Sequence, residues 1–280
     1  MTAVESSIYF LERSELWKTE KPFVLDYVPE PPAVKSNASV ADKPVVIEDI
    51  RGRESQFTYA ENGFCLLPLD HGMEPADFDD DAKVRDVYLR NVGDALKTTL
   101  RASRVQIYDY IVRKREAQFP LSTGKFYSHK QPSSIAHVDT TPTYMEEMLD
   151  TLNPTEADRL RVGRYQSVNV WKPLRGPIRD WPLALCDPRS VDTSELQARD
   201  TVRRDSYIET YQMHWNQNQK WYYVRDQMPN EAWVFLQGEV SETGGSMLGV
   251  PHTSFPNSLA SADDLPRESI EVRAFVYYED

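Results

Sequence analysis

The sequence predicts an α+β fold whose second half is dominated by β-strands, and two features of the chain carry this prediction. A single long amphipathic helix is expected from about Asp80 to Ala102, and many short segments rich in β-branched and aromatic residues follow it. Clusters of Pro, Gly, Asn and Asp separate those segments. Short strands behind a leading helix are typical of a β-sandwich or barrel flanked by helices.

The first part of the chain is expected to form an arm. The stretch from Pro29 to Lys43 is rich in Pro, Ala and Ser, which favours an exposed and extended connection. We therefore interpret residues 1–280 as a single domain in which residues 1–60 pack as an N-terminal arm on a core of about 104–280. A length of 280 residues is enough to bury the core of one such domain.

Two helices are expected. The apolar stripe of the long helix recurs every four residues and consists of Val84, Tyr88, Val92, Leu96 and Leu100. Three aspartates at residues 79–81 stand at its start, where they favour the helix dipole. A second, shorter helix is expected after Asn153, because Asn-Pro-Thr-Glu offers an N-cap, a proline at the first helical position and an acidic residue in the first turn.

Six segments are predicted strands because β-branched and aromatic residues are concentrated in them. They are Arg104–Arg113, Tyr165–Trp171, Tyr207–Trp215, Trp221–Arg225, Ala232–Gln237 and Ser269–Tyr278.

Composition narrows the class of protein. The net charge of -12 argues against nucleic acid or an anionic membrane surface as the main partner. No apolar run approaches the roughly 18 residues that a membrane span needs, and acidic residues interrupt the N-terminal segment where a secretory signal would be apolar. The expected location is the cytoplasm, with Cys65 and Cys186 as reduced thiols.

Candidate metal ligands begin with the segment His137-Val138-Asp139. In a strand, residues two apart point to the same side, so this segment presents an imidazole and a carboxylate on one face. Mononuclear iron oxygenases use two imidazoles and one carboxylate and keep the remaining positions open. A surface His-Asp pair is the alternative interpretation, since one His-x-acid motif is expected by chance among five histidines.

The third ligand is expected from a distant strand. His252 follows an apolar approach and the Glu-Thr-Gly-Gly-Ser turn at residues 242–246, and it precedes the last predicted strand. A hydrogen-bonded core histidine is the alternative. His71, His129 and His214 are interpreted as structural, because they lie in a turn, a polar connection and an aromatic strand.

The final strand offers a site for a carboxylate. Arg267 and Ser269 share one face by the same period of two, and a guanidinium beside a hydroxyl suits the distal carboxylate of a keto acid. Arg273 continues on that face and is a second candidate, or else a salt-bridge partner of Glu271. Ordinary exposed strand charges are the alternative for both arginines.

Several blocks of the chain resemble the fungal hydroxylase/desaturase family that includes gibberellin desaturase and proteins related to cephem 7α-methoxylase. The blocks are Asn-Val-Trp-Lys-Pro-Leu-Arg-Gly-Pro-Ile-Arg-Asp-Trp-Pro-Leu-Ala-Leu-Cys-Asp from residue 169, Trp-Tyr-Tyr-Val from 221, Pro-His-Thr-Ser-Phe from 251 and Pro-Arg-Glu-Ser-Ile-Glu-Val-Arg from 266. The resemblance covers roughly Tyr108 to Tyr278, and the Asn-Val-Trp-x-Pro-Leu block is quite specific.

This resemblance implies a double-stranded β-helix, or jelly-roll, oxygenase that uses iron(II), 2-oxoglutarate and O₂. It implies iron ligands at His137, Asp139 and His252 and a co-substrate carboxylate site at Arg267 with Ser269, while Arg273 stays open as the alternative. The substrate is expected to be a small natural product that is hydroxylated, desaturated or cyclised. Weaker candidates for substrate contact are Tyr127, Arg164, Tyr165, Asn169 and Trp171.

Two competing functions remain at this point. One is an iron oxidase of the same fold that does not use 2-oxoglutarate. The other is a jelly-roll binding module without catalysis, against which the complete set of ligands argues. A monomer or a homodimer is expected.

Overall fold

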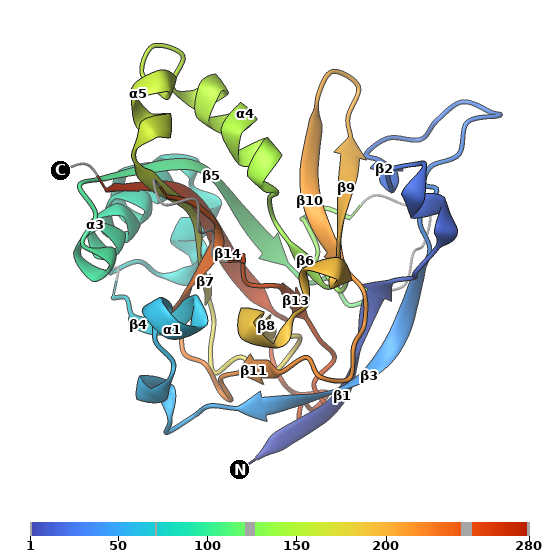
Figure 1. Cartoon of the computed structure of the whole chain (residues 1–280). Coiled ribbons are helices and arrows are strands. Elements are labelled where there is room, and N and C mark those ends of the chain that lie inside the picture. Colours follow the sequence, from blue (N-terminus) through green and yellow to red (C-terminus); the bar gives the residue numbers. More distant parts are fainter. Residues whose placement is uncertain (1, 71, 121–126, 242–247, 279–280) are drawn as a thin grey trace.

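The computed structural model describes residues 2–70, 72–120, 127–241 and 248–278, and most of its regular structure is in two β-sheets (Figure 1). His71 and the turn at 242–246 lie outside these residues. In spatial order, the nine-stranded sheet consists of β1 (Ala3–Leu11), β3 (Val40–Asp49), β11 (Trp221–Tyr223), β8 (Leu183–Cys186), β13 (His252–Ser254), β6 (His137–Val138), β10 (Tyr207–Met213), β9 (Leu196–Val202) and β2 (Phe23–Leu25). The predicted β-dominated α+β class is confirmed.

The second sheet has five antiparallel strands. In spatial order they are β4 (Phe64–Pro68), β12 (Glu231–Val240), β7 (Arg164–Pro173), β14 (Glu268–Tyr278) and β5 (Arg104–Lys114). The nine-stranded sheet is mostly antiparallel as well, with parallel pairs only at β11–β3 and β2–β9 among the described strands. All six predicted strands exist, although those expected to end at Trp215 and Arg225 end at Met213 and Tyr223.

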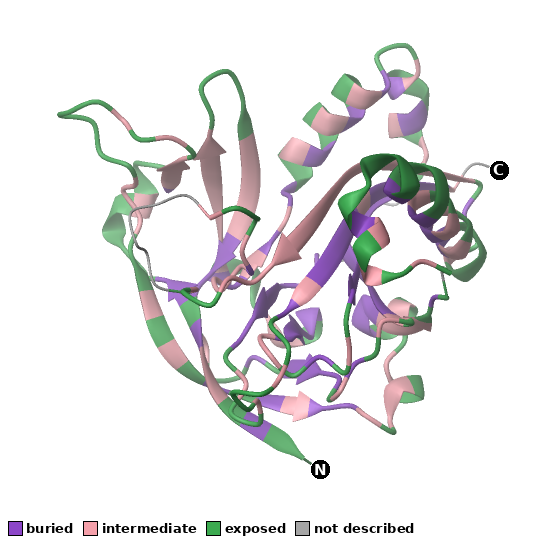
Figure 2. Cartoon of the chain, turned by 180° about the vertical axis from the view of Figure 1, so that it is seen from behind, coloured by how far each residue is buried: buried purple, intermediate pink, exposed green. Residues whose placement is uncertain are grey.

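The two faces of the five-stranded sheet differ in chemistry because side chains alternate along each strand. The outer face is apolar and contributes Val168, Val170, Ile270, Val272, Ala274 and Val276 to a buried core. The inner face carries the residues between them, among which are Asn169, Trp171, Ser269, Glu271 and Arg273. Figure 2 shows that the central strands are buried. The sheet therefore packs on one side and presents polar groups on the other.

The long predicted helix covers the outer face. It runs through α2 (Asp81–Lys83), a π-helical turn (Val84–Tyr88) and α3 (Leu89–Leu100), with Asp80 as its N-cap. The predicted stripe residues Val84, Tyr88, Val92 and Leu96 are all buried in the core that they share with the sheet. The helix and its apolar face are confirmed.

A short helix follows Asn153 as predicted, but Asn153 is not its N-cap. A helix that was not predicted, α4 (Pro142–Leu152), ends there, and the Asn153 side chain donates to the Leu149 carbonyl as a C-cap. The next helix, α5 (Ala157–Val162), begins only after a turn. Asparagine serves both ends of helices, so the residue type alone does not choose between a start and an end.

The N-terminal residues are hydrogen-bonded into the nine-stranded sheet. β1 pairs with β3 along its whole length, and β3 pairs in parallel with β11. The remaining regular elements are α1 (Tyr59–Asn62) and short 3₁₀ turns at Glu15–Lys18, Glu54–Gln56, Pro75–Asp79, Pro188–Ser190 and Thr193–Glu195. None of the helices in the described ranges is long and apolar enough to cross a membrane.

A buried lysine on the outer face makes the unfolding free energy of the protein depend on pH. Lys172 on β7 is fully buried, donates to the Pro229 carbonyl at 2.8 Å and lies 5.2 Å from the centre of the Phe78 ring. Burial lowers its pKa to about 7, and Asp70 opposes the shift. An unfolded lysine has a pKa near 10.4, so between about pH 7 and 10 the unfolded chain binds more protons and stability rises with pH.

We expect Lys172→Met to remove this contribution. Between pH 7 and 9 the wild type should gain about 2 kcal/mol of unfolding free energy relative to the variant, measured by urea denaturation at both pH values. Lys97→Met on the exposed side of α3 is the control and should leave the pH dependence unchanged. Equal slopes for wild type and Lys172→Met would contradict the assignment.

Candidate metal centre

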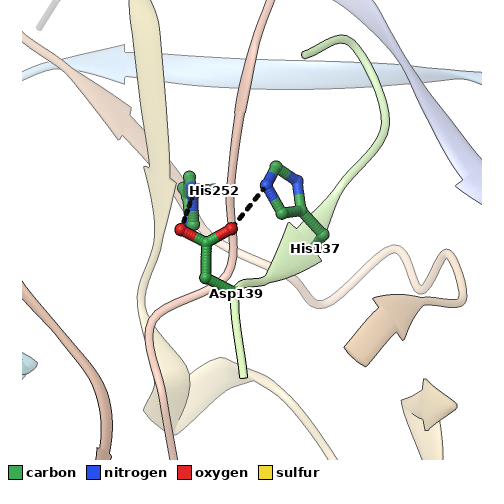
Figure 3. A group of neighbouring side chains, drawn as sticks. All are labelled: His137, Asp139 and His252. Carbon is green, nitrogen blue, oxygen red and sulfur yellow. Dashed lines mark ion pairs between the residues drawn. The ribbon is translucent and has the colours of Figure 1, made fainter. Parts of the chain in front are cut away.

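Three side chains from neighbouring strands converge between the sheets (Figure 3). His252 on β13 stands directly opposite His137 on β6, and Asp139 follows two residues after His137. The His137 Nε2 atom lies 3.4 Å from Asp139 Oδ1, and His252 Nε2 lies 3.8 Å from Oδ2. One potential ligand atom from each residue lies within 4.8 Å of the others. The structure thus brings together the three residues that the sequence selected.

Both imidazoles are held in the same tautomer by the same local contact. Nδ1 of His137 donates to the Ile135 carbonyl at 2.7 Å, and Nδ1 of His252 donates to the Val250 carbonyl at 3.2 Å. In each case the acceptor is two residues earlier in the chain. With Nδ1 protonated, the Nε2 lone pair points toward the other ligands, as a metal-binding histidine requires.

An unsatisfied nitrogen supports a metal at this position. Nε2 of His252 is buried and has no hydrogen-bond partner among the described residues. Burial, followed by the neighbouring His137, lowers the pKa of His252 to about 4, so its imidazole is neutral at physiological pH. A neutral imidazole with a buried, unpartnered lone pair fits a metal ion.

The Asp139 carboxylate is fixed from the opposite sheet. Asn169 Nδ2 on β7 donates to Oδ2 at 2.6 Å, and Arg273 Nε on β14 donates to the same oxygen at 3.1 Å. Burial alone would raise the pKa of Asp139, but Arg273 and the contact with His137 hold it well below its usual value. The carboxylate is therefore ionised, with Oδ2 occupied by protein donors and Oδ1 directed toward His137.

The backbone beside this carboxylate is also positioned by the smaller sheet. The Asp139 N–H donates to Gln237 Oε1 at 2.7 Å, and Gln237 lies at an irregularity in the pairing of β12 with β7. Bulges of this kind re-aim a side chain. Gly249 passes so close to the Gln237 carbonyl that a Cβ there would overlap it. Gln237 and Gly249 were not predicted, because neither stands in a motif of its own.

Arg273 is fully engaged in ion pairs. Besides Asp139, its guanidinium donates to Asp109 at 3.1 Å and to Glu271 at 2.8 Å. Although burial opposes the shift, Asp139 and Glu271 raise its pKa above the usual value. This arginine matches the predicted salt-bridge partner of Glu271, and it orients the candidate metal ligand Asp139.

Arg267 has a different environment. Its guanidinium is buried, lies 4.9 Å above the Trp171 ring, and donates to Ser269 Oγ at 3.1 Å and to the Trp181 carbonyl at 2.7 Å. No carboxylate of the described residues forms an ion pair with it. Burial, together with the nearby Arg113, lowers its pKa to about 9. A buried guanidinium held by neutral acceptors is suited to an anionic ligand.

The remaining sequence candidates lie elsewhere. Arg164 at the start of β7 is exposed and pairs with Glu239 at 2.6 Å, whereas Tyr165 is buried under α4 with Phe275. Tyr127 is half-buried in the segment between β5 and β6. The structure does not bring Arg164 or Tyr165 to the three converging residues. His214 donates from Nδ1 to the Leu11 carbonyl, as a packed histidine does.

Together, the three side chains can coordinate one metal ion without filling all of its coordination positions. Two imidazole nitrogens and one carboxylate oxygen are the donor set of mononuclear iron oxygenases. All three come from one region between the sheets, so the opposite coordination positions remain for exogenous ligands.

Comparisons with known proteins agree with this chemistry. The family model described as "Oxidoreductase/YMDC permease-like domain" matches residues 8–277. The hydroxylase/desaturase efuI of Hormonema carpetanum is 30% identical over 257 residues, covering 85% of this chain and 84% of that protein. The alpha-ketoglutarate-dependent dioxygenase tstK of Talaromyces stipitatus is 31% identical over 84% of each chain.

A solved structure shares the fold over the whole chain. The iron and alpha-ketoglutarate-dependent endoperoxidase NvfI superposes with a TM-score of 0.84 at 26% identity, covering 100% of this chain and 99% of that one. The corresponding dioxygenase of Aspergillus novofumigatus is 27% identical over 99% of this chain and 97% of its own length. This match agrees with the jelly-roll fold that was expected.

We expect Asn169→Ala to weaken metal binding by about tenfold to a hundredfold, because Oδ2 of Asp139 loses its shortest hydrogen bond and the carboxylate can rotate. Titration with Co(II), followed by its visible absorption, measures the change. Ser167→Ala is the matched control, since Ser167 shares the strand and face but contacts Tyr108. Unchanged affinity in Asn169→Ala would show that the hydrogen bond does not position the carboxylate.

Proposed function

We propose that this chain, which belongs to the family of fungal hydroxylases/desaturases and 2-oxoglutarate-dependent dioxygenases, is itself an iron(II)- and 2-oxoglutarate-dependent oxygenase. The convergence of two imidazoles and one ionised carboxylate carries the proposal. Its substrate would be a small molecule, on which a C–H bond is hydroxylated, desaturated or used for ring closure.

His137, Asp139 and His252 would hold the metal. Iron(II) bound there would supply O₂ activation, which would couple the decarboxylation of 2-oxoglutarate to succinate and CO₂ with a two-electron oxidation of the substrate. The protein supplies binding and orientation. Because Nδ1 of each histidine donates to a backbone carbonyl, its Nε2 lone pair would be available to the metal. Asn169 and Arg273 donate to Oδ2 of Asp139, so Oδ1 would bind the metal.

Arg267 would bind the distal carboxylate of 2-oxoglutarate. Trp171, over which it stacks, is two residues from Asn169 on β7, so the guanidinium is displaced from the metal centre by about 7 Å along that strand. Ser269 holds the guanidinium from the same face. Arg273 is the weaker alternative because three carboxylates already surround it.

The remaining expectations belong to the same proposal. We propose a single domain acting in the cytoplasm as a monomer or homodimer, without nucleic acid or a membrane as partner. The net charge of -12 supports the last part, since it disfavours polyanionic surfaces.

Anaerobic addition of iron(II) and 2-oxoglutarate is expected to produce a visible charge-transfer band, because the keto acid chelates iron through the positions that the protein leaves open. His252→Ala should abolish the band, and the exposed His129→Ala should retain it. The wild type without a band, or a band indifferent to His252→Ala, would overturn the proposal. Product formation without succinate would instead favour an oxidase that does not use 2-oxoglutarate.

Titrating the same band with 2-oxoglutarate separates the two arginines. Arg267→Gln should weaken the co-substrate by about tenfold to a hundredfold, the equivalent of losing a charged hydrogen bond, and should leave Co(II) affinity unchanged. Arg267→Lys should recover part of the loss. If Arg267→Gln binds 2-oxoglutarate normally while Arg273→Gln does not, the assignment of the two residues is reversed.

A further inference from the structure

Arg199 is a cation on the sheet face that carries the two metal-binding histidines. One cross-strand row on this face runs through His252, His137, Gln212 and Gln197. Arg199 lies two residues beyond Gln197 on β9, and its partner Thr210 lies two residues before Gln212 on β10. Because side chains alternate between faces, Arg199 and Thr210 point to the same side as this row.

No group of the described residues neutralises Arg199. Its Nε is buried without a hydrogen-bond acceptor, and it forms no ion pair with any described residue. The acidic residues of the same hairpin, Asp200 and Glu209, are cross-strand partners on the opposite face, where both bind Lys21. Burial lowers the pKa of Arg199, and no carboxylate of the described residues offsets this shift.

The surroundings of Arg199 point to an anionic ligand. Within the row, the Oε1 atom of Gln212 on β10 is also buried without a partner among the described residues, so a second polar group on this face is free to bind a ligand. A partly buried cation without a counter-charge destabilises the folded chain. Residues that lower stability in this way are typical of functional sites.

The geometry relates this cation to the metal centre. Neighbouring strands lie about 4.8 Å apart and residues two apart along a strand about 7 Å, so the Cα atoms of Arg199 and His137 are separated by about 12 Å. A molecule whose acidic group binds Arg199 can therefore extend along the sheet face to His137 and His252. Arg267 directly precedes β14 of the opposite sheet, and under the proposed function it would bind a different anion, the co-substrate.

We infer that Arg199 binds a carboxylate of the substrate and thereby selects which carbon faces the metal centre. The inference rests on the proposed function and adds a substrate class, namely apolar small molecules that carry a carboxylate. A single guanidinium flanked by the neutral Thr210 and Gln197 suits a monoanion. Phosphate groups are more often bound by several cations or by a helix N-terminus.

The test uses the full chain loaded with Zn(II) and 2-oxoglutarate, which occupy the metal and co-substrate sites without turnover. Decanoate and decanamide then serve as probes that differ in charge, with binding measured by calorimetry. Wild type should bind decanoate at least tenfold more tightly than decanamide, and Arg199→Met should lose that preference. Arg199→Lys should retain a preference for the acid, and Arg203→Met, an exposed arginine of the same hairpin, should behave as wild type.

Thermal unfolding of the ligand-free protein gives a second readout. Removing an unpaired cation should leave the Tm of Arg199→Met equal to wild type or raise it by about 2 °C. A lower Tm in Arg199→Met would identify Arg199 as a structural residue and overturn the inference, as would equal binding of acid and amide to wild type or no binding of decanoate. Failure of 2-oxoglutarate to stabilise the Zn(II)-loaded wild type would instead count against the proposed function.

Discussion

The contact between Asp139 and the pair Asn169 and Arg273 is the constraint on which the metal centre depends. Asp139 follows a strand of the nine-stranded sheet, whereas its two partners belong to the five-stranded sheet. A buried carboxylate is stable only when it is paired and hydrogen-bonded, so the two sheets must meet in this one arrangement. The position of the candidate ligand is thus set by the packing of the whole domain.

In the five-stranded sheet, alternate residues of a strand have different roles: one set packs in the apolar core and the other faces the candidate site. On β7, Val168 and Val170 face the helix α3, while Asn169 and Trp171 face the candidate site. A slip of one residue in pairing would exchange these two sets, so the apolar core that fixes the register also fixes the polar groups. The long helix contributes to the site indirectly, because it covers the apolar face that holds β7 and β14 in register.

The sequence was informative where the chemistry is local. His137 and Asp139 could be paired from their spacing, since two residues of one extended segment share a face without reference to the fold. The choice between Arg267 and Arg273 could not be made in that way, because an even spacing along one extended segment puts both on the same face; Arg267 directly precedes β14 and Arg273 lies within it. They differ only in neighbours brought by other strands, which are three carboxylates for Arg273 and the Trp171 ring for Arg267.

Local patterns were misleading where one residue type has two structural uses. A proline such as Pro142 is compatible both with the end of an extended stretch and with the start of a helix, and here it occupies the first turn of α4, where its missing N–H is harmless. Asn153 was interpreted as a helix start and is a helix end. In both cases the deciding information is the packing of Met145 and Leu149 against Tyr165, which lies outside the helix itself.

Three arginines, Arg273, Arg267 and Arg199, differ in the partners that the protein offers to their guanidinium groups. Arg273 is surrounded by carboxylates of the chain and therefore serves structure, holding Asp139 in place. Arg267 has neutral acceptors only, and Arg199 has no partner among the described residues. Acidic side chains are abundant in a chain with a net charge of -12. The lack of an acidic partner for Arg267 and Arg199 among the described residues is therefore a specific property of this site. Each uncompensated charge lowers the stability of the empty protein and becomes favourable only when an anion arrives. Two such positions are what the proposed function and the inferred carboxylate site together require, with one anion bound beside Trp171 and the other along the face of β9.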